Sequence, residues 1–242
     1  MRRIGFSTGA VARGDFRQAL DLLRGQTIDV VELSALRMSE LEPLVSAIPY
    51  LDLRYFSFIS VHAPSWFTPE SEQWVVDQLN SISRYGFPVV VHPDVIFTPR
   101  KWQHFEDRLL VENMDRRKPI GRNVSELRHI FDWLPEARFC FDIGHARQVD
   151  PSMTESSLLL GAFGDRLGEV HISEVNTASR HDPISPNAVI AFQSVAKYIP
   201  EDVPIMLESL IDKGQSEIQR EVQRAREALS VVSFTASLSP TR

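Results

Sequence analysis

The chain alternates between short apolar runs and longer segments whose apolar residues recur at helical spacing. Most of the short runs are continuously apolar, a pattern typical of strands that are buried on both faces of a parallel sheet. Eight such runs lie at residues 3–7, 29–34, 58–62, 88–92, 109–113, 138–142, 169–173 and 204–209.

The segments between these runs predict amphipathic helices, several of which end at a glycine or a proline. They lie at residues 15–25, 71–86, 123–135, 185–200 and 216–232, and only a brief helix fits between the fourth and fifth strands. Strands that alternate with helices imply right-handed crossovers in a parallel sheet. Eight strands over 242 residues therefore predict an α/β fold, a single-domain (β/α)8 TIM barrel spanning residues 1–242, with a frayed tail at 233–242.

Composition narrows the range of functions. The apolar fraction of 43% and the charged fraction of 24% are ordinary for a globular protein, and the net charge of −6 argues against a nucleic-acid partner. A single cysteine, Cys140, excludes an internal disulfide and favours a reducing cytoplasm. No signal peptide is recognisable at the N-terminus, and no apolar run is long enough to span a membrane, so no membrane association is expected.

Acidic and imidazole side chains gather where the predicted strands end. In barrels of this type the chemistry lies at the carboxyl ends of the strands, and five of the seven histidines fall at or just past those ends. The residues at these positions are Glu32, His62, His92, Glu112, Asp142, His145, His171, His181 and Glu208. Imidazole and carboxylate groups that converge on one rim are typical ligands of Zn²⁺, Mn²⁺ or Fe²⁺.

The segment "FCFDIGHARQ" (139–148) gives the physical reason for a metal. Asp142 ends an apolar strand, and burying its carboxylate costs several kcal/mol unless a cation neutralises it. A bound metal ion supplies that charge, and the turn that follows brings His145 to the same rim. A lone buried glutamate also has structural explanations, so Glu32 is placed outside the metal set. The candidate substrate contacts are Glu32, His145, Arg180 and His181.

Six motifs together resemble the xylose-isomerase-like TIM-barrel superfamily, which contains sugar isomerases and epimerases and also endonuclease IV. The motifs are "VHAP" (61–64), "VVVHPD" (89–94), "LLVENMD" (109–115), "FDIGHA" (141–146), "EVHISE" (169–174) and "IMLES" (205–209). The resemblance extends over most of the chain, and it implies two different ligand sets.

The resemblance to ketose 3-epimerases implies one divalent ion held by Glu112, Asp142, His171 and Glu208. Glu112 and Glu208 would also be the acid and base, and His145 would contact the substrate. The resemblance to endonuclease IV implies three zinc ions. The first would use His62, His92 and a bridging Glu112, and the second would use the four-residue set. The third would use His145, His181 and an aspartate two positions before His181, where this chain has Ser179 and has Asp182 only on the other side.

The first hypothesis is a divalent-metal-dependent (Zn²⁺ or Mn²⁺) isomerase or epimerase of a small carbohydrate or polyol. The metal would polarise a carbonyl while the two glutamates transfer protons. The acidic net charge and the complete four-residue set favour it. The alternative is a zinc phosphodiesterase acting on abasic DNA, which would give His62, His92 and His181 a role. Barrels of this kind often pair, so a homodimer is left open.

Overall fold

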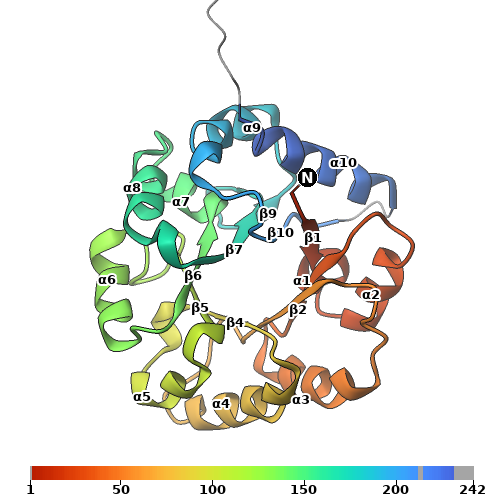
Figure 1. The fold of residues 1–242 in the computed structure, drawn as a ribbon, viewed down its shortest axis with the longest axis vertical. Helices are drawn as coiled ribbons and strands as arrows, with labels where there is room; N and C mark the ends of the chain where they lie inside the picture. Colours follow the sequence, from red (N-terminus) through yellow and green to blue (C-terminus); the bar gives the residue numbers. More distant parts are fainter. Residues whose placement is uncertain (1, 212–214, 232–242) are drawn as a thin grey trace, which may run out of the picture.

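The computed structural model describes residues 2–211 and 215–231, so the predicted tail at 233–242 lies outside the described part. Eight parallel strands close into a barrel in the order β1-β10-β7-β6-β5-β4-β3-β2, which confirms the predicted (β/α)8 fold (Figure 1). The strands are β1 Ile4–Ser7, β2 Val30–Ser34, β3 Phe58–His62, β4 Val89–Val91, β5 Leu109–Glu112, β6 Arg138–Asp142, β7 Leu167–Ile172 and β10 Ile205–Leu207.

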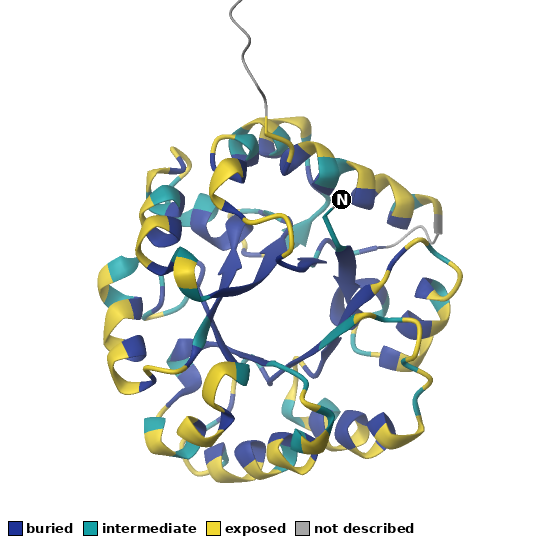
Figure 2. Cartoon of the chain, in the orientation of Figure 1, coloured by how far each residue is buried: buried dark blue, intermediate teal, exposed yellow. Residues whose placement is uncertain are grey.

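Helices surround the barrel, and most turn a buried face to the strands and an exposed face outward (Figure 2). They are α1 Thr8–Ala12, α2 Phe16–Leu23, α3 Met38–Ala47, α4 Glu72–Ser81, α5 Pro99–Trp102, α6 Val124–Trp133, α7 Ile143–Val149, α8 Thr154–Phe163, α9 Pro186–Gln193 and α10 Gln215–Ala228. Of these, α1 and α7 have no exposed residue. A small antiparallel hairpin, β8 Glu174–Val175 and β9 His181–Asp182, follows β7. No helix in the described ranges is both long and apolar enough to cross a membrane.

The predicted helices are present, but α1, α3, α7 and α8 were not predicted. Pro43 lies inside α3, where proline normally marks a helix end, and burial of Leu41 and Leu44 nonetheless keeps the segment helical. α7 is only seven residues long, which is too short for a clear periodicity. The brief helix expected between the fourth and fifth strands is α5, which continues into a 3-10 helix at Gln103–Arg108.

Alternation along the strands places the functional side chains in the lumen. Outward residues such as Leu33, Val61 and Phe141 join the apolar core between strands and helices. Residues one position away face the lumen, where register pairs Ser34 with His62 and Glu112 with Cys140. The lumen therefore holds two layers of side chains. The outer layer lies at the carboxyl ends of the strands and consists of side chains that can bind a metal ion, and the inner layer lies directly beneath it.

Candidate metal centre

A cavity of about 280 Å³ opens at the carboxyl ends of the strands. The sequence-predicted residues that line it are His62, His92, Glu112, His145, Arg180, His181 and Glu208. They come from β3, the end of β4, β5, the first turn of α7, the β8–β9 hairpin and the end of β10. Asp142 and His171 are fully buried and do not line the cavity. The structure thus gathers the predicted site residues from six separate parts of the chain, as the parallel barrel requires.

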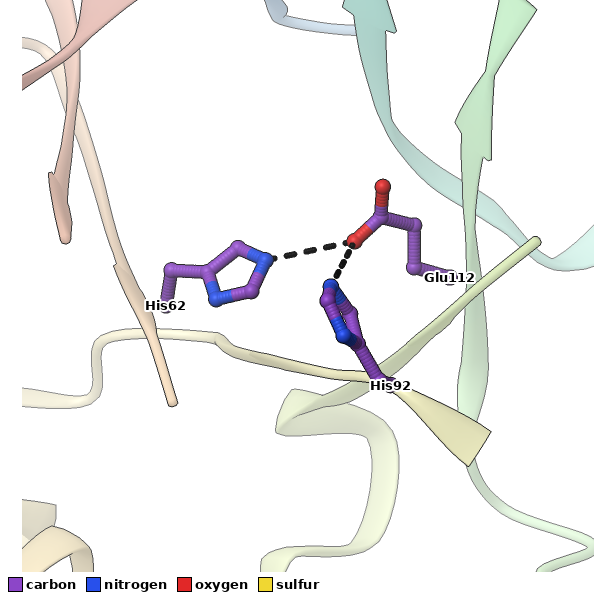
Figure 3. Close-up of side chains that lie close together, drawn as sticks. All are labelled: His62, His92 and Glu112. Atoms are coloured by element: carbon purple, nitrogen blue, oxygen red, sulfur yellow. Dashed lines mark hydrogen bonds and ion pairs between the residues drawn. The ribbon is translucent and has the colours of Figure 1, made fainter. Parts of the chain in front are cut away.

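Glu112 lies at the centre of this group. One carboxylate oxygen, Oε2, lies 3.2 Å from Nε2 of His62 and 3.3 Å from Nε2 of His92 (Figure 3). The other oxygen, Oε1, lies 3.2 Å from Nδ1 of His145 and 3.5 Å from Nδ1 of His171. The two oxygens therefore face two different sets of ligands, which is the arrangement of a carboxylate that bridges two ions.

The ligand set on one side of Glu112 consists of His62, His92 and Glu112, and its donor atoms suit a metal ion. His62 Nδ1 lies 2.6 Å from the carbonyl oxygen of Ala63, which can only accept, so Nδ1 carries a proton and Nε2 is the nitrogen that a metal ion would bind in place of its proton. Ligand atoms of His62, His92 and Glu112 all lie within 4.8 Å of one another. Two imidazoles and a carboxylate are a common protein contribution to a zinc site that keeps one position open.

The second set consists of Glu112, Asp142, His171 and Glu208, whose ligand atoms also lie within 4.8 Å of one another. Three buried atoms in this set have no hydrogen-bond partner: Asp142 Oδ2, His171 Nδ1 and Glu208 Oε2. A buried polar atom without a partner costs about 1–3 kcal/mol. A cation at the centre of the set would satisfy all three atoms, so the donors fit a divalent ion.

The turn after β6 positions a third set of potential metal ligands. Asp142 caps α7 by accepting a 2.7 Å hydrogen bond from the backbone N–H of His145 through Oδ1, which leaves Oδ2 for the lumen. Gly144 is needed in this turn, because a Cβ there would lie 2.5 Å from the carbonyl oxygen of Ser173. The resulting set is Asp142, His145 and His181. Asp182 is not part of it.

The buried groups of the metal-free cluster shift one another's pKa values. Burial lowers the pKa of His62, but Glu32 and Glu112 raise it to about 9 overall. Burial likewise opposes protonation of His145, whereas Asp142 and Glu112 raise its pKa to about 10. Burial raises the pKa of Asp142 to about 7. Without metal, protons on His62 and His145 therefore offset the carboxylates, whereas burial lowers the pKa of His92, and a metal ion would take the place of those protons.

Three cationic side chains stand at the rim of the cavity. Lys118 Nζ lies 2.9 Å from Asp94 Oδ2, and Arg117 Nη2 lies 3.0 Å from Asp115 Oδ2. Arg180 is exposed, and its guanidinium has no hydrogen-bond or ion-pair partner within residues 2–211 and 215–231. The rim therefore offers at least one unpaired cation directly beside His181.

Glu32 does not lie where a substrate contact would be. It is fully buried, it does not line the cavity, and its Oε2 lies 3.2 Å from Nε2 of His171. Sequence analysis also missed Glu169, which lies 3.2 Å from the same nitrogen, and the rim residue Asp115. Glu169 stands two positions before His171 on β7, so period-two alternation would have placed it in the lumen.

No protein-family model matches the sequence, and no curated protein matches it. Solved structures match along nearly the whole chain. Endonuclease IV from Thermus thermophilus superposes with a TM-score of 0.63 at 18% identity, covering 94% of this chain and 98% of that chain. A xylose isomerase-like TIM barrel protein from Mycobacterium smegmatis in complex with magnesium gives a TM-score of 0.58 at 11% identity, with 95% and 98% covered.

A sugar epimerase has the same architecture. The 3-keto-D-glucoside 4-epimerase from E. coli superposes with a TM-score of 0.53 at 13% identity, covering 94% of this chain and 99% of that chain. At these identities the likeness concerns the fold. At that level it confirms the predicted resemblance: the chain has the fold of the xylose-isomerase-like TIM barrels.

Proposed function

We propose that this protein is a multinuclear-metal-dependent hydrolase of phosphate esters. The observation that carries the proposal is the position of Glu112, whose two oxygens face separate sets of imidazoles. A single ion in the four-residue set would leave His62 and His92 without a role. Sites with two ions about 3.5–4 Å apart are typical of phosphatases and nucleases, where they clamp the attacking and leaving oxygens.

The residues of the chain divide this chemistry between them. Bound metal supplies an activated water and stabilises charge on the phosphoryl oxygens. Glu112 holds the two ligand sets in a fixed relation, and the Ala63 carbonyl fixes the tautomer of His62. Asp142 is held by the first turn of α7. Arg180, which lines the cavity at the rim, would bind an anionic oxygen of the substrate.

The substrate class follows from the cavity and the charge of the chain. A cavity of about 280 Å³ with a cationic rim suits a small phosphate ester. Binding of duplex DNA relies on many phosphate contacts, and the net charge of −6 does not favour them. We therefore place a small phosphate monoester or diester ahead of abasic DNA.

The metal-dependent isomerase or epimerase is the second candidate. The observation that favours it is the four-residue set itself, which is complete and includes both Glu112 and Glu208 next to the cavity. Those two carboxylates are the candidate acid and base for a small carbohydrate. The cytoplasmic location and a homodimer remain predictions for either function.

Two measurements on the full chain separate these candidates. Protein purified with excess Zn²⁺ or Mn²⁺ and then desalted is assayed for metal content by mass spectrometry. The same protein is tested on aryl phosphate mono- and diesters, an abasic-site oligonucleotide and a panel of ketoses. The hydrolase predicts two or more ions per chain and phosphate ester turnover. One ion per chain with ketose epimerisation would replace it by the second candidate.

A matched variant controls for nonspecific damage. Glu72→Gln alters another fully buried carboxylate, which lies on the outer side of the barrel and accepts a 3.1 Å hydrogen bond from Trp102 Nε1. It should retain metal content and turnover, whereas Glu208→Gln should lose turnover by orders of magnitude while remaining folded. A fully active Glu208→Gln variant would remove that residue from both mechanisms.

A further inference from the structure

The two ring nitrogens of His171 face two different layers of the lumen. Nδ1 lies 3.4 Å from Glu208 Oε1 and 3.5 Å from Glu112 Oε1, and it has no hydrogen-bond partner. Nε2 lies 3.2 Å from Glu32 Oε2 and 3.2 Å from Glu169 Oε1. The same imidazole thus joins the four-residue metal set to a second pair of carboxylates beneath it.

The lower pair is unusual because both carboxylates are completely buried. Glu32 and Glu169 each have 0% exposure, and one oxygen of each, Oε2, has no hydrogen-bond partner. Their other contacts are hydroxyl groups: Ser34 Oγ donates to Glu32 at 3.0 Å, and Ser60 Oγ donates to Glu169 at 3.1 Å. Within the described ranges no lysine or arginine pairs with either carboxylate. The imidazole of His171 is therefore the nitrogen group that both contact: Nε2 is hydrogen-bonded to Glu169 Oε1, and Glu32 Oε2 lies at ion-pair distance from the same nitrogen.

A neutral imidazole carries one N–H, and its neighbours decide which nitrogen holds it. With a metal ion on Nδ1 the imidazole would be neutral, and because a carboxylate can only accept, the two carboxylates beside Nε2 favour the remaining proton there. Nδ1 would then offer its lone pair to the ion that Glu112 and Glu208 also bind. Partners of this kind orient a ligand and raise its basicity, and their loss typically weakens metal binding about 10–100-fold.

We propose that Glu169, which accepts the Nε2–H of His171, and Glu32, whose negative charge lies beside the same nitrogen, are positioning residues that present Nδ1 to the metal ion. The inference rests on the metal centre of the proposed function but not on its reaction. It also gives Glu32 a role different from the substrate contact that the sequence suggested.

The test compares the wild type with the double variant Glu32→Gln/Glu169→Gln. Glutamine has the same shape but carries no charge, and its amide can donate to Nε2, so the other tautomer becomes accessible. Zn²⁺ affinity is measured by competition with a chromophoric chelator, on variants whose thermal unfolding shows that they are folded. We expect affinity at one site to fall about 10–100-fold. Glu221→Gln, another fully buried carboxylate but on α10, should leave affinity unchanged.

The position of the proton on the His171 ring is a readout that would not change if Glu32 and Glu169 had a purely structural role. In wild-type protein labelled with ¹⁵N-histidine, the resonances absent from a His171→Gln variant belong to His171. Zinc-loaded wild type should show a protonated Nε2. Metal-free protein is measured at a pH at which His171 is neutral, where the single proton should lie on Nε2 in the wild type and partly on Nδ1 in the double variant. A wild-type Nε2 without a proton would overturn the proposal, even if the double variant failed to fold. So would unchanged affinity in a folded double variant. If the chain bound no zinc, the proposed function would fail, whereas the metal-free tautomer would still test this inference.

Discussion

Replacement of Glu112 by glutamine tests the bridging geometry directly. The carboxylate oxygens lie 3.2–3.3 Å from His62 and His92 on one side, and 3.2–3.5 Å from His145 and His171 on the other. Glutamine keeps one oxygen but replaces the other with an NH₂ group, which cannot bind a metal ion. One of the two ligand sets therefore loses its shared ligand, and the number of bound ions should fall by at least one.

The size of the effect on turnover follows from what the lost ion supplies. Lewis-acid stabilisation by a metal is worth several kcal/mol of transition-state energy. A loss of about 4 kcal/mol corresponds to roughly a thousandfold in rate, since each 1.36 kcal/mol is tenfold. We expect kcat for a phosphate ester to fall about 10³-fold in Glu112→Gln, with a melting temperature that shows an intact barrel.

Metal content by mass spectrometry and kcat are measured on the same preparation, so that the two losses can be compared. Glu72→Gln is the control. The carboxylate of Glu72 is as buried as that of Glu112, but it lies outside the lumen and accepts a 2.8 Å hydrogen bond from the backbone N–H of Thr98. A Glu112→Gln protein that keeps every ion and stays within tenfold of wild-type turnover would refute the bridging role.

Three further results are expected. Arg180→Ala should raise KM for a phosphate ester about tenfold with little change in kcat, because one charge-assisted hydrogen bond is worth about 1.5–3 kcal/mol and this one is exposed; an unchanged KM in steady-state assays would remove Arg180 from substrate binding. Chelation by EDTA should lower the melting temperature by about 8–16 °C, since ligand at a thousand times Kd stabilises by about 4 kcal/mol; coincident calorimetric melts would contradict a resident metal. Ser179→Asp should add about one bound ion beside His145 and His181, because Ser179 lines the cavity and aspartate tolerates its φ of 53°. The uncharged Ser179→Asn is the control and should add none. Equal metal content in the two variants would exclude this position as a ligand.

Strand positions were predictable because burial on both faces leaves a clear mark on the sequence. All eight apolar runs correspond to barrel strands, and the predicted residues at or just past the ends of β3, β4, β5 and β10 reach the rim: His62, His92, Glu112 and Glu208. Helices were harder to predict. α8 carries Leu158 at 53% exposure as well as the buried Leu159 and Leu160, so its apolar residues do not mark one face. The hairpin that carries His181 has only two residues in each strand, which is too short to leave a pattern.

The contacts between side chains within the site could not be predicted from the sequence. The chain shows that Glu112 ends β5, but only the tertiary arrangement shows that its two oxygens face different imidazoles. The same holds for Glu169 and Glu32, which come from distant strands and meet at one nitrogen of His171. Pairing of this kind depends on strand register and tilt, which are set by the closure of the whole barrel.

The charge of the lumen bears on how many ions the protein holds. Five carboxylates lie in two adjoining layers: Glu32, Glu112, Asp142, Glu169 and Glu208. In the described part of the chain their ion-pair partners are histidines alone. If the carboxylates are ionised and the imidazoles neutral, one divalent ion leaves three negative charges in the lumen, and two ions leave one. Each uncompensated buried charge costs several kcal/mol. A chain that held a single ion would therefore have to keep protons on its histidines or on carboxylates such as Asp142, whose pKa burial raises to about 7, whereas two ions nearly balance the site and release the imidazoles as ligands.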